Sequence, residues 1–94
     1  MSATILVVED EPGIQELLKF NLGLHGHDVV VASDAEEASS LLRGALPDLI
    51  LLDWMLPGMS GIDFARRVRA DSRQKNIPII MLTARSDERN KVQG

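Results

Sequence analysis

Three acidic side chains and one hydroxyl group stand directly after apolar runs, where they could do chemistry together. Glu9 and Asp10 follow the first run, Asp53 follows another, and Thr83 follows a third. Carboxylates held close together repel one another, and a bound cation relieves that repulsion. Mg²⁺ suits such oxygen ligands, because it takes one or two carboxylates, keeps several waters and accepts phosphate oxygens. A carboxylate beside the ion can then attack phosphorus. The set suggests phosphoryl transfer onto Asp53.

Each of these residues also has an ordinary structural explanation. Acidic residues are common in turns at strand ends, and threonine is frequent in strands. Trp54 and Met55 are more often packing residues than ligands. The combination favours function: the Thr83 hydroxyl and the backbone N–H groups of Trp54 and Ala84 could all donate to a phosphoryl oxygen that is bound at Asp53.

The order of apolar runs and helical patterns predicts how these groups meet. Each predicted strand is followed by a predicted helix, in the order βαβαβαβα, which implies a doubly wound parallel sheet with helices on both faces. In such sheets ligands bind at the carboxyl ends of the strands, near the switch in strand order. The predicted strands span residues 4–8, 28–32, 48–53 and 77–82.

Helix boundaries and buried faces are also predicted from residue types. Pro12, Ser33 or Asp34, Ser60, and Ser86 mark the four helix starts, and Gly44 ends the second helix. The expected buried stripes, in chain order, are Ile14, Leu17, Leu18 and Leu22; Ala35, Ala38, Leu41 and Leu42; and Ile62, Ala65 and Val68.

Length and charge narrow the class of protein. The 94 residues allow one domain. The net charge of −4 argues against nucleic-acid binding by this segment. No cysteine is present, so disulfides and thiolate metal sites are excluded. No apolar run approaches the roughly 20 residues that span a bilayer, and no basic signal region precedes the first run. We therefore expect a cytoplasmic protein that does not bind membranes.

Three segments resemble the receiver domains of two-component response regulators. They are Ile5-Leu6-Val7-Val8-Glu9-Asp10-Glu11, Pro47 to Gly58 followed by Ser60-Gly61, and Ile77 to Ala84. The resemblance covers essentially the whole chain and implies a CheY-like (flavodoxin-like) fold. The run Leu51-Leu52-Asp53-Trp54-Met55-Leu56-Pro57-Gly58 is most similar to PhoB-like members of the OmpR/PhoB subfamily, which regulate the transcription of phosphate-responsive genes.

The resemblance assigns a role to each site residue. Asp53 would be the phosphoacceptor. Mg²⁺ or Mn²⁺ would be bound by Asp10 directly, by Glu9 largely through water, by Asp53, and by the backbone carbonyl of Met55. Thr83 would be the switch hydroxyl, with Ala84 and Trp54 also contacting the phosphoryl group. The donor would be a sensor histidine kinase, for which small acyl or amido phosphates can substitute, and the only catalysis expected is self-phosphotransfer and autodephosphorylation.

The chain departs from the family at its end. A complete receiver carries a further strand that ends in Lys-Pro and a final helix, and PhoB-like members add a winged-helix DNA-binding domain. We therefore expect residues 1–94 to be a receiver domain that lacks its C-terminal part. The fourth strand would then be an exposed edge, and we expect it to pair with a second copy in a homodimer or strand-exchanged oligomer.

Two other functions compete with the switch. A haloacid-dehalogenase-like phosphohydrolase also uses a nucleophilic aspartate and Mg²⁺, but it expects a second aspartate where Met55 stands. A pseudo-receiver would serve as an interaction module without phosphorylation, and the intact acidic residues at positions 9, 10 and 53 argue against it.

Overall fold

The structure is a computed structural model, and it describes residues 3–82. Strands and helices alternate along these residues, and all four predicted strands are confirmed. The helix expected from Ser86 lies outside the described residues. The elements are β1 (Thr4–Val8), α1 (Pro12–Leu24), β2 (Asp28–Ala32), α2 (Ala35–Gly44), β3 (Leu49–Asp53), α3 (Gly61–Ala70) and β4 (Ile79–Leu82).

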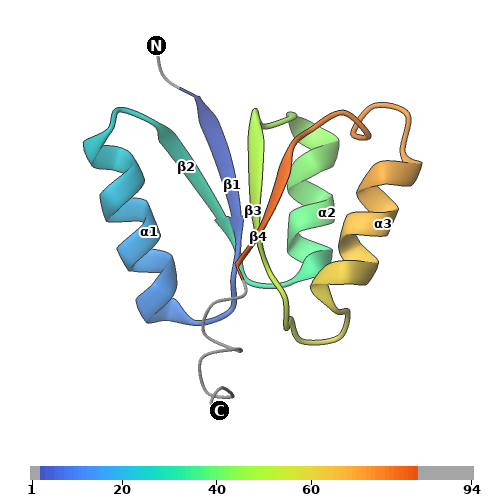
Figure 1. The fold of residues 1–94 in the computed structure, drawn as a ribbon, viewed down its shortest axis with the longest axis horizontal. Coiled ribbons are helices and arrows are strands. Elements are labelled where there is room, and N and C mark those ends of the chain that lie inside the picture. The colour runs from blue at the N-terminus through green and yellow to red at the C-terminus, as the bar shows by residue number, and fades with distance from the viewer. Residues whose placement is uncertain (1–2, 83–94) are drawn as a thin grey trace.

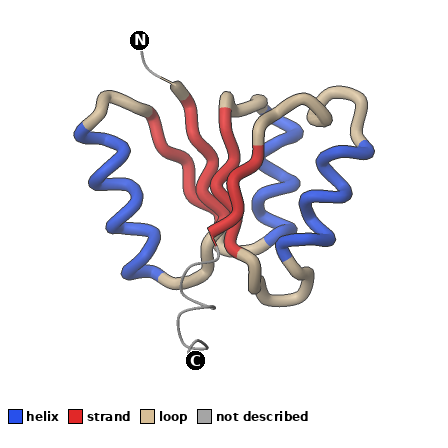
Figure 2. Tube along the Cα trace, in the orientation of Figure 1, coloured by secondary structure: helices blue, strands red, loops and turns tan. Residues whose placement is uncertain are grey.

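The four strands form one parallel sheet in the order β2-β1-β3-β4. Helix α1 covers one face of the sheet, and α2 and α3 lie side by side over the other (Figure 1). The tube in Figure 2 shows the resulting three layers, with the sheet in the middle. The predicted doubly wound α/β arrangement is therefore confirmed.

Alternate residues of the central strands supply two apolar layers, as expected for strands covered on both faces. In β1, Leu6 and Val8 belong to the layer under α2 and α3, whereas Ile5 and Val7 face α1. Both layers contact the middle of the sheet, so β1 and β3 are the most deeply buried elements. Their burial fixes the positions of the residues at their carboxyl ends.

The predicted helical faces are only partly correct. Leu17 is 59% exposed and Leu41 is also exposed, so neither belongs to the core. The buried residues of α3 are Gly61, Phe64 and Val68, whereas Ile62 and Ala65 are only partly buried. Phe64 was missed, although its spacing from Gly61 and Val68 is that of one helical face.

Two helices begin at side-chain caps that the sequence predicts. The Glu37 backbone N–H donates to Asp34 Oδ1 at 2.8 Å, so Asp34, rather than Ser33, caps α2. The Glu37 carboxylate in turn accepts from the Ser33 N–H at 2.8 Å. Ser60 caps α3, accepting from the Asp63 N–H at 3.1 Å. These caps satisfy backbone donors that have no partner within the helix.

The outermost strands of the described sheet are β2 and β4. Strand β4 pairs with β3 alone among residues 3–82, and Ile80 is 52% exposed. Pairing of β4 with a second copy of the chain stays a prediction. In the same residues, no helix has the length and apolar character needed to cross a membrane.

Candidate functional site

The carboxyl ends of β1 and β3 lie next to each other at the point where the strand order switches. Strand β1 pairs with β2 on one side and with β3 on the other. Val8 is aligned with Leu52, so Glu9, which directly follows β1, and Asp53, the last residue of β3, are the next residues along the two segments. This is the place where open α/β sheets bind ligands.

Three carboxylates converge at this switch point. One oxygen atom from each of Glu9, Asp10 and Asp53 lies within 4.8 Å of the others. Glu9 and Asp53 are each 1% exposed, whereas Asp10 is exposed. Negative charges this close, two of them out of water, oppose one another strongly. A divalent cation among hard oxygen donors relieves that opposition, so the geometry and the donor set fit Mg²⁺.

The backbone around Glu9 is fixed by hydrogen bonds to neighbouring elements. Its N–H donates to the Ala32 carbonyl at 2.9 Å, and its Oε2 accepts from the Glu11 N–H at 3.0 Å. The Gln15 side-chain amide donates to the Glu9 carbonyl and to Ser33 Oγ, the latter at 3.3 Å. Gln15 therefore links the loop that follows β1, which carries Glu9 and Asp10, to the loop that follows β2.

Sequence reasoning missed Gln15. Its only signal is its place in the first turn of the helix that follows the acidic pair. The contact with Ser33 joins residues 18 positions apart, so it depends on how the two loops meet in space.

The remaining predicted site residues are less well defined by the fold. Trp54 and Met55 are exposed in the loop after β3. The Trp54 carbonyl accepts a hydrogen bond from the Gly61 N–H at 2.9 Å, which anchors this loop to the start of α3. Thr83 and Ala84 lie outside the described residues. The structure therefore brings together Glu9, Asp10 and Asp53, and it leaves the other assignments as predictions.

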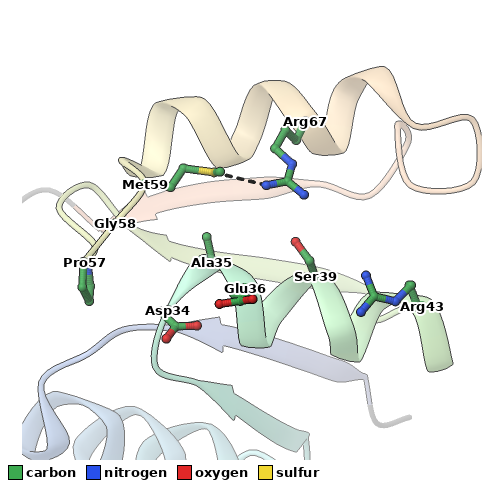
Figure 3. A pocket seen from close by; sticks show the side chains of 9 residues that line it. All are labelled: Asp34, Ala35, Glu36, Ser39, Arg43, Pro57, Gly58, Met59 and Arg67. Atoms are coloured by element: carbon green, nitrogen blue, oxygen red, sulfur yellow. Dashed lines mark hydrogen bonds between the residues drawn. The ribbon is translucent and has the colours of Figure 1, made fainter.

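A separate hollow of about 650 Å³ lies between α2, α3 and the loop after β3 (Figure 3). Arg67 Nη1 contacts Met59 Sδ at 3.7 Å along its upper wall. None of the three clustered carboxylates lines this hollow, so it is not the candidate metal site. Its lining residues are Asp34, Ala35, Glu36, Ser39, Arg43, Pro57, Gly58, Met59 and Arg67.

Comparison with known proteins identifies the family. The family model of the response regulator receiver domain matches residues 5–94. The chain belongs to this family. A receiver is a phosphorylation switch rather than a classical enzyme, and neither the phosphohydrolase nor the pseudo-receiver alternative gains support from the match.

Individual relatives agree with the family assignment. The chain is 48% identical over 91 residues to the phosphate regulon transcriptional regulatory protein PhoB of Pseudomonas aeruginosa, covering 97% of this chain and 40% of that protein. It is also 48% identical to PhoB of Escherichia coli, over 100% of this chain and 41% of that protein. This receiver chain therefore spans about two fifths of the length of these curated relatives.

Solved structures show the same fold. The signal receiver domain of a signal transduction histidine kinase from Syntrophus aciditrophicus superposes with a TM-score of 0.85 at 35% identity, covering 97% of this chain and 69% of that one. The chemotaxis response regulator CheY4 of Vibrio cholerae gives 0.83 at 30% identity, covering 100% and 82%. The predicted CheY-like fold of the receiver is thus confirmed.

Proposed function

We propose that this receiver domain accepts a phosphoryl group on Asp53 from a sensor histidine kinase. The observation that carries the proposal is the convergence of the Glu9, Asp10 and Asp53 carboxylates within 4.8 Å at the switch point of the sheet. Of the three, Asp53 alone comes from β3, so it can face an incoming phosphoryl group across the acidic pair that follows β1.

The proposed transfer is a displacement at phosphorus. One carboxylate oxygen of Asp53 forms a bond to the phosphorus of a phosphohistidine, and the bond from phosphorus to the histidine nitrogen breaks. The electron pair stays on that nitrogen, which is then protonated. The backbone N–H groups of Trp54 and Ala84 and the Thr83 hydroxyl donate to the phosphoryl oxygens in this proposal.

The acidic cluster is the proposed site of the metal. Asp10 would bind it directly, Glu9 largely through water, and Asp53 and the Met55 carbonyl would complete the protein ligands. A bound Mg²⁺, or Mn²⁺ in its place, would offset the charge that the carboxylates and the phosphoryl oxygens bring together. Burial of Glu9 and Asp53 limits the access of water to the reacting carboxylate.

The wider role follows from the relatives. We propose that the chain is the receiver of a PhoB-like transcriptional regulator of phosphate-responsive genes, acting in the cytoplasm. A DNA-binding domain elsewhere in the protein would then carry the output, in keeping with the net charge of −4 on this segment. Strong identity to two PhoB proteins supports this assignment.

Phosphorylation by a small donor tests the acceptor. The purified chain is incubated with acetyl phosphate and Mg²⁺, and its intact mass is measured. We expect the unchanged chain to gain one acid-labile phosphoryl group and Asp53→Asn to gain none, because the amide is a poor nucleophile.

A second variant tests whether replacing any aspartate near β3 has the same effect. Asp48 directly precedes β3, at the end opposite Asp53, and accepts from the Thr4 N–H at 2.8 Å, a bond that asparagine can keep. Asp48→Asn should be phosphorylated like the parent. An equal mass increase in Asp53→Asn would show that another residue is the acceptor and would contradict the proposal.

A further inference from the structure

Gly61, the first residue of α3, is packed directly against the backbone of Asp53. A Cβ atom built on Gly61 would lie 2.2 Å from the Asp53 carbonyl oxygen and 3.2 Å from the Asp53 carbonyl carbon. The first distance is far inside van der Waals contact. The start of α3 therefore touches the end of β3 through a space that only a residue without a side chain leaves open.

The Asp53 carbonyl that a Cβ on Gly61 would meet is a backbone group and cannot rotate away as a side chain can. A Cβ on Gly61 would also meet Met81 Cε at 3.2 Å, but a methionine side chain can rotate away. The carbonyl of Asp53 belongs to a strand residue aligned with Leu82 of β4. Any atom added at Gly61 must therefore move the Asp53 backbone or move α3.

Backbone conformation does not explain the glycine. Among the described residues, only Gly26 and Gly58 have positive φ angles, so Gly61 has a conformation that alanine adopts without strain. Alanine is also a better helix former than glycine. The absence of a side chain at position 61 thus serves the close approach to Asp53.

A second contact fixes the same peptide segment. The Gly61 N–H donates to the Trp54 carbonyl at 2.9 Å, so Gly61 holds the residues on both sides of the Asp53–Trp54 peptide bond. That segment carries the buried carboxylate and the N–H group assigned to a phosphoryl oxygen. Ser60, by contrast, acts within α3, because its hydroxyl accepts from the Asp63 N–H.

We propose that Gly61 is a positioning residue for phosphoryl transfer, setting the place of the Asp53 carboxylate and the Trp54 N–H through its contact with the Asp53 carbonyl. The inference rests on the proposed function of Asp53. Small displacements of a reacting group reduce rates steeply, with about 1 Å able to cost about 100-fold. A methyl group at position 61 should therefore slow transfer far more than it unfolds the chain.

The test compares alanine at three positions. Gly44 lies at the end of α2 with open space around its Cβ position, so Gly44→Ala adds the same methyl without a contact. Ser60→Ala removes the cap of α3 and destabilises the helix without adding an atom near Asp53. Phosphorylation by acetyl phosphate is followed at saturating donor and Mg²⁺, and rates are divided by the folded fraction from circular dichroism.

We expect Gly61→Ala to lose at least about tenfold in this corrected maximal rate, with Gly44→Ala and Ser60→Ala within about twofold of the parent. In the chain without metal or donor, Gly61→Ala should also shift the Trp54 amide resonance, and Ser60→Ala should shift it less. A corrected rate for Gly61→Ala within twofold of the parent would overturn the inference.

Two further outcomes are distinguishable. If Gly61→Ala is unfolded in buffer, the assay is repeated in trimethylamine N-oxide, which favours the folded state; a full rate there, or failure to fold even there, would overturn the positioning role. If Asp53→Asn is phosphorylated as fast as the parent, the proposed acceptor is wrong, whatever Gly61→Ala does.

Discussion

Asp10 is the exposed member of a carboxylate cluster whose other two members are buried. Because its carboxylate faces solvent, it can be removed without leaving a cavity in the core. We expect Asp10→Ala to weaken Mg²⁺ binding by at least about tenfold, or about 1.4 kcal/mol, because the variant lacks the carboxylate that we propose as a direct ligand. The measurement is a Mg²⁺ titration followed by the fluorescence of Trp54, which adjoins Asp53.

A neighbouring acidic residue gives the matched control for this titration. Glu11 is also exposed and charged, but it is not part of the cluster. Glu11→Gln should leave the midpoint of the titration within about twofold, because a surface charge outside the site contributes only weakly. Equal weakening by the two variants would mean that the ion responds to general charge, and Asp10 would no longer be assigned as a ligand.

Among individual residues, those at strand ends could be predicted from the sequence, whereas those whose role depends on a tertiary contact could not. Glu9, Asp10 and Asp53 are recognisable because each follows an uninterrupted apolar run that parallel strands bring to one edge. Gly61 looks like an ordinary turn residue until its distance to the Asp53 carbonyl is known. Gln15 is likewise recognised only after the two loops it joins are placed together.

Helix α2 depends on its first residues more than on its length. It has 10 residues, too few to be stable alone in water. Asp34 satisfies the Glu37 N–H at its start. We expect Asp34→Ala to lower the free energy of unfolding by about 1 kcal/mol, the usual cost of losing a cap. Urea unfolding measures the change.

Asparagine is the control for this cap. Its side-chain oxygen accepts the same hydrogen bond, so Asp34→Asn should retain most of the stability. The part that it loses reports the favourable interaction of the negative charge with the helix N-terminus. If Asp34→Asn lowered the free energy of unfolding as much as Asp34→Ala, the stabilisation would come from the charge of Asp34 and not from its hydrogen bond.

Strands were predicted more accurately than helical faces, for a physical reason. Strand β1 is apolar on both sides, so its assignment does not depend on which side faces the core. A helix needs the direction of burial as well as its period. Leu17 and Leu41 fit the period, yet both are exposed, while Leu42 is buried. Direction depends on the neighbouring elements, which no local pattern contains.

At the scale of the whole molecule, the order of the strands determines where the three carboxylates meet. The chain leaves β1 toward β2 on one side and returns to β3 on the other, with α1 on one face and α2 and α3 on the opposite face (Figure 1). Because the strand order reverses here, the loops after β1 and β3 run to opposite faces of the sheet and leave a crevice between them. The carboxylates at the carboxyl ends of the two strands meet in this crevice. The acidic cluster is therefore a product of the strand order as well as of the residues themselves.

The same sheet carries a prediction about assembly. Within residues 3–82, β4 has a strand neighbour on its β3 side only, and the exposed Ile80 lies in its middle. An apolar strand edge is a template for pairing with another chain, and a lysine on such an edge opposes pairing. We expect the 94-residue chain to associate at micromolar concentration, and Ile80→Lys to shift it toward monomer, as measured by size-exclusion chromatography with light scattering.

Leu24→Lys is the control, because Leu24 is similarly exposed but lies on α1. If both variants reduced association equally, general hydrophobicity would explain it; a monomeric parent chain would remove strand pairing altogether.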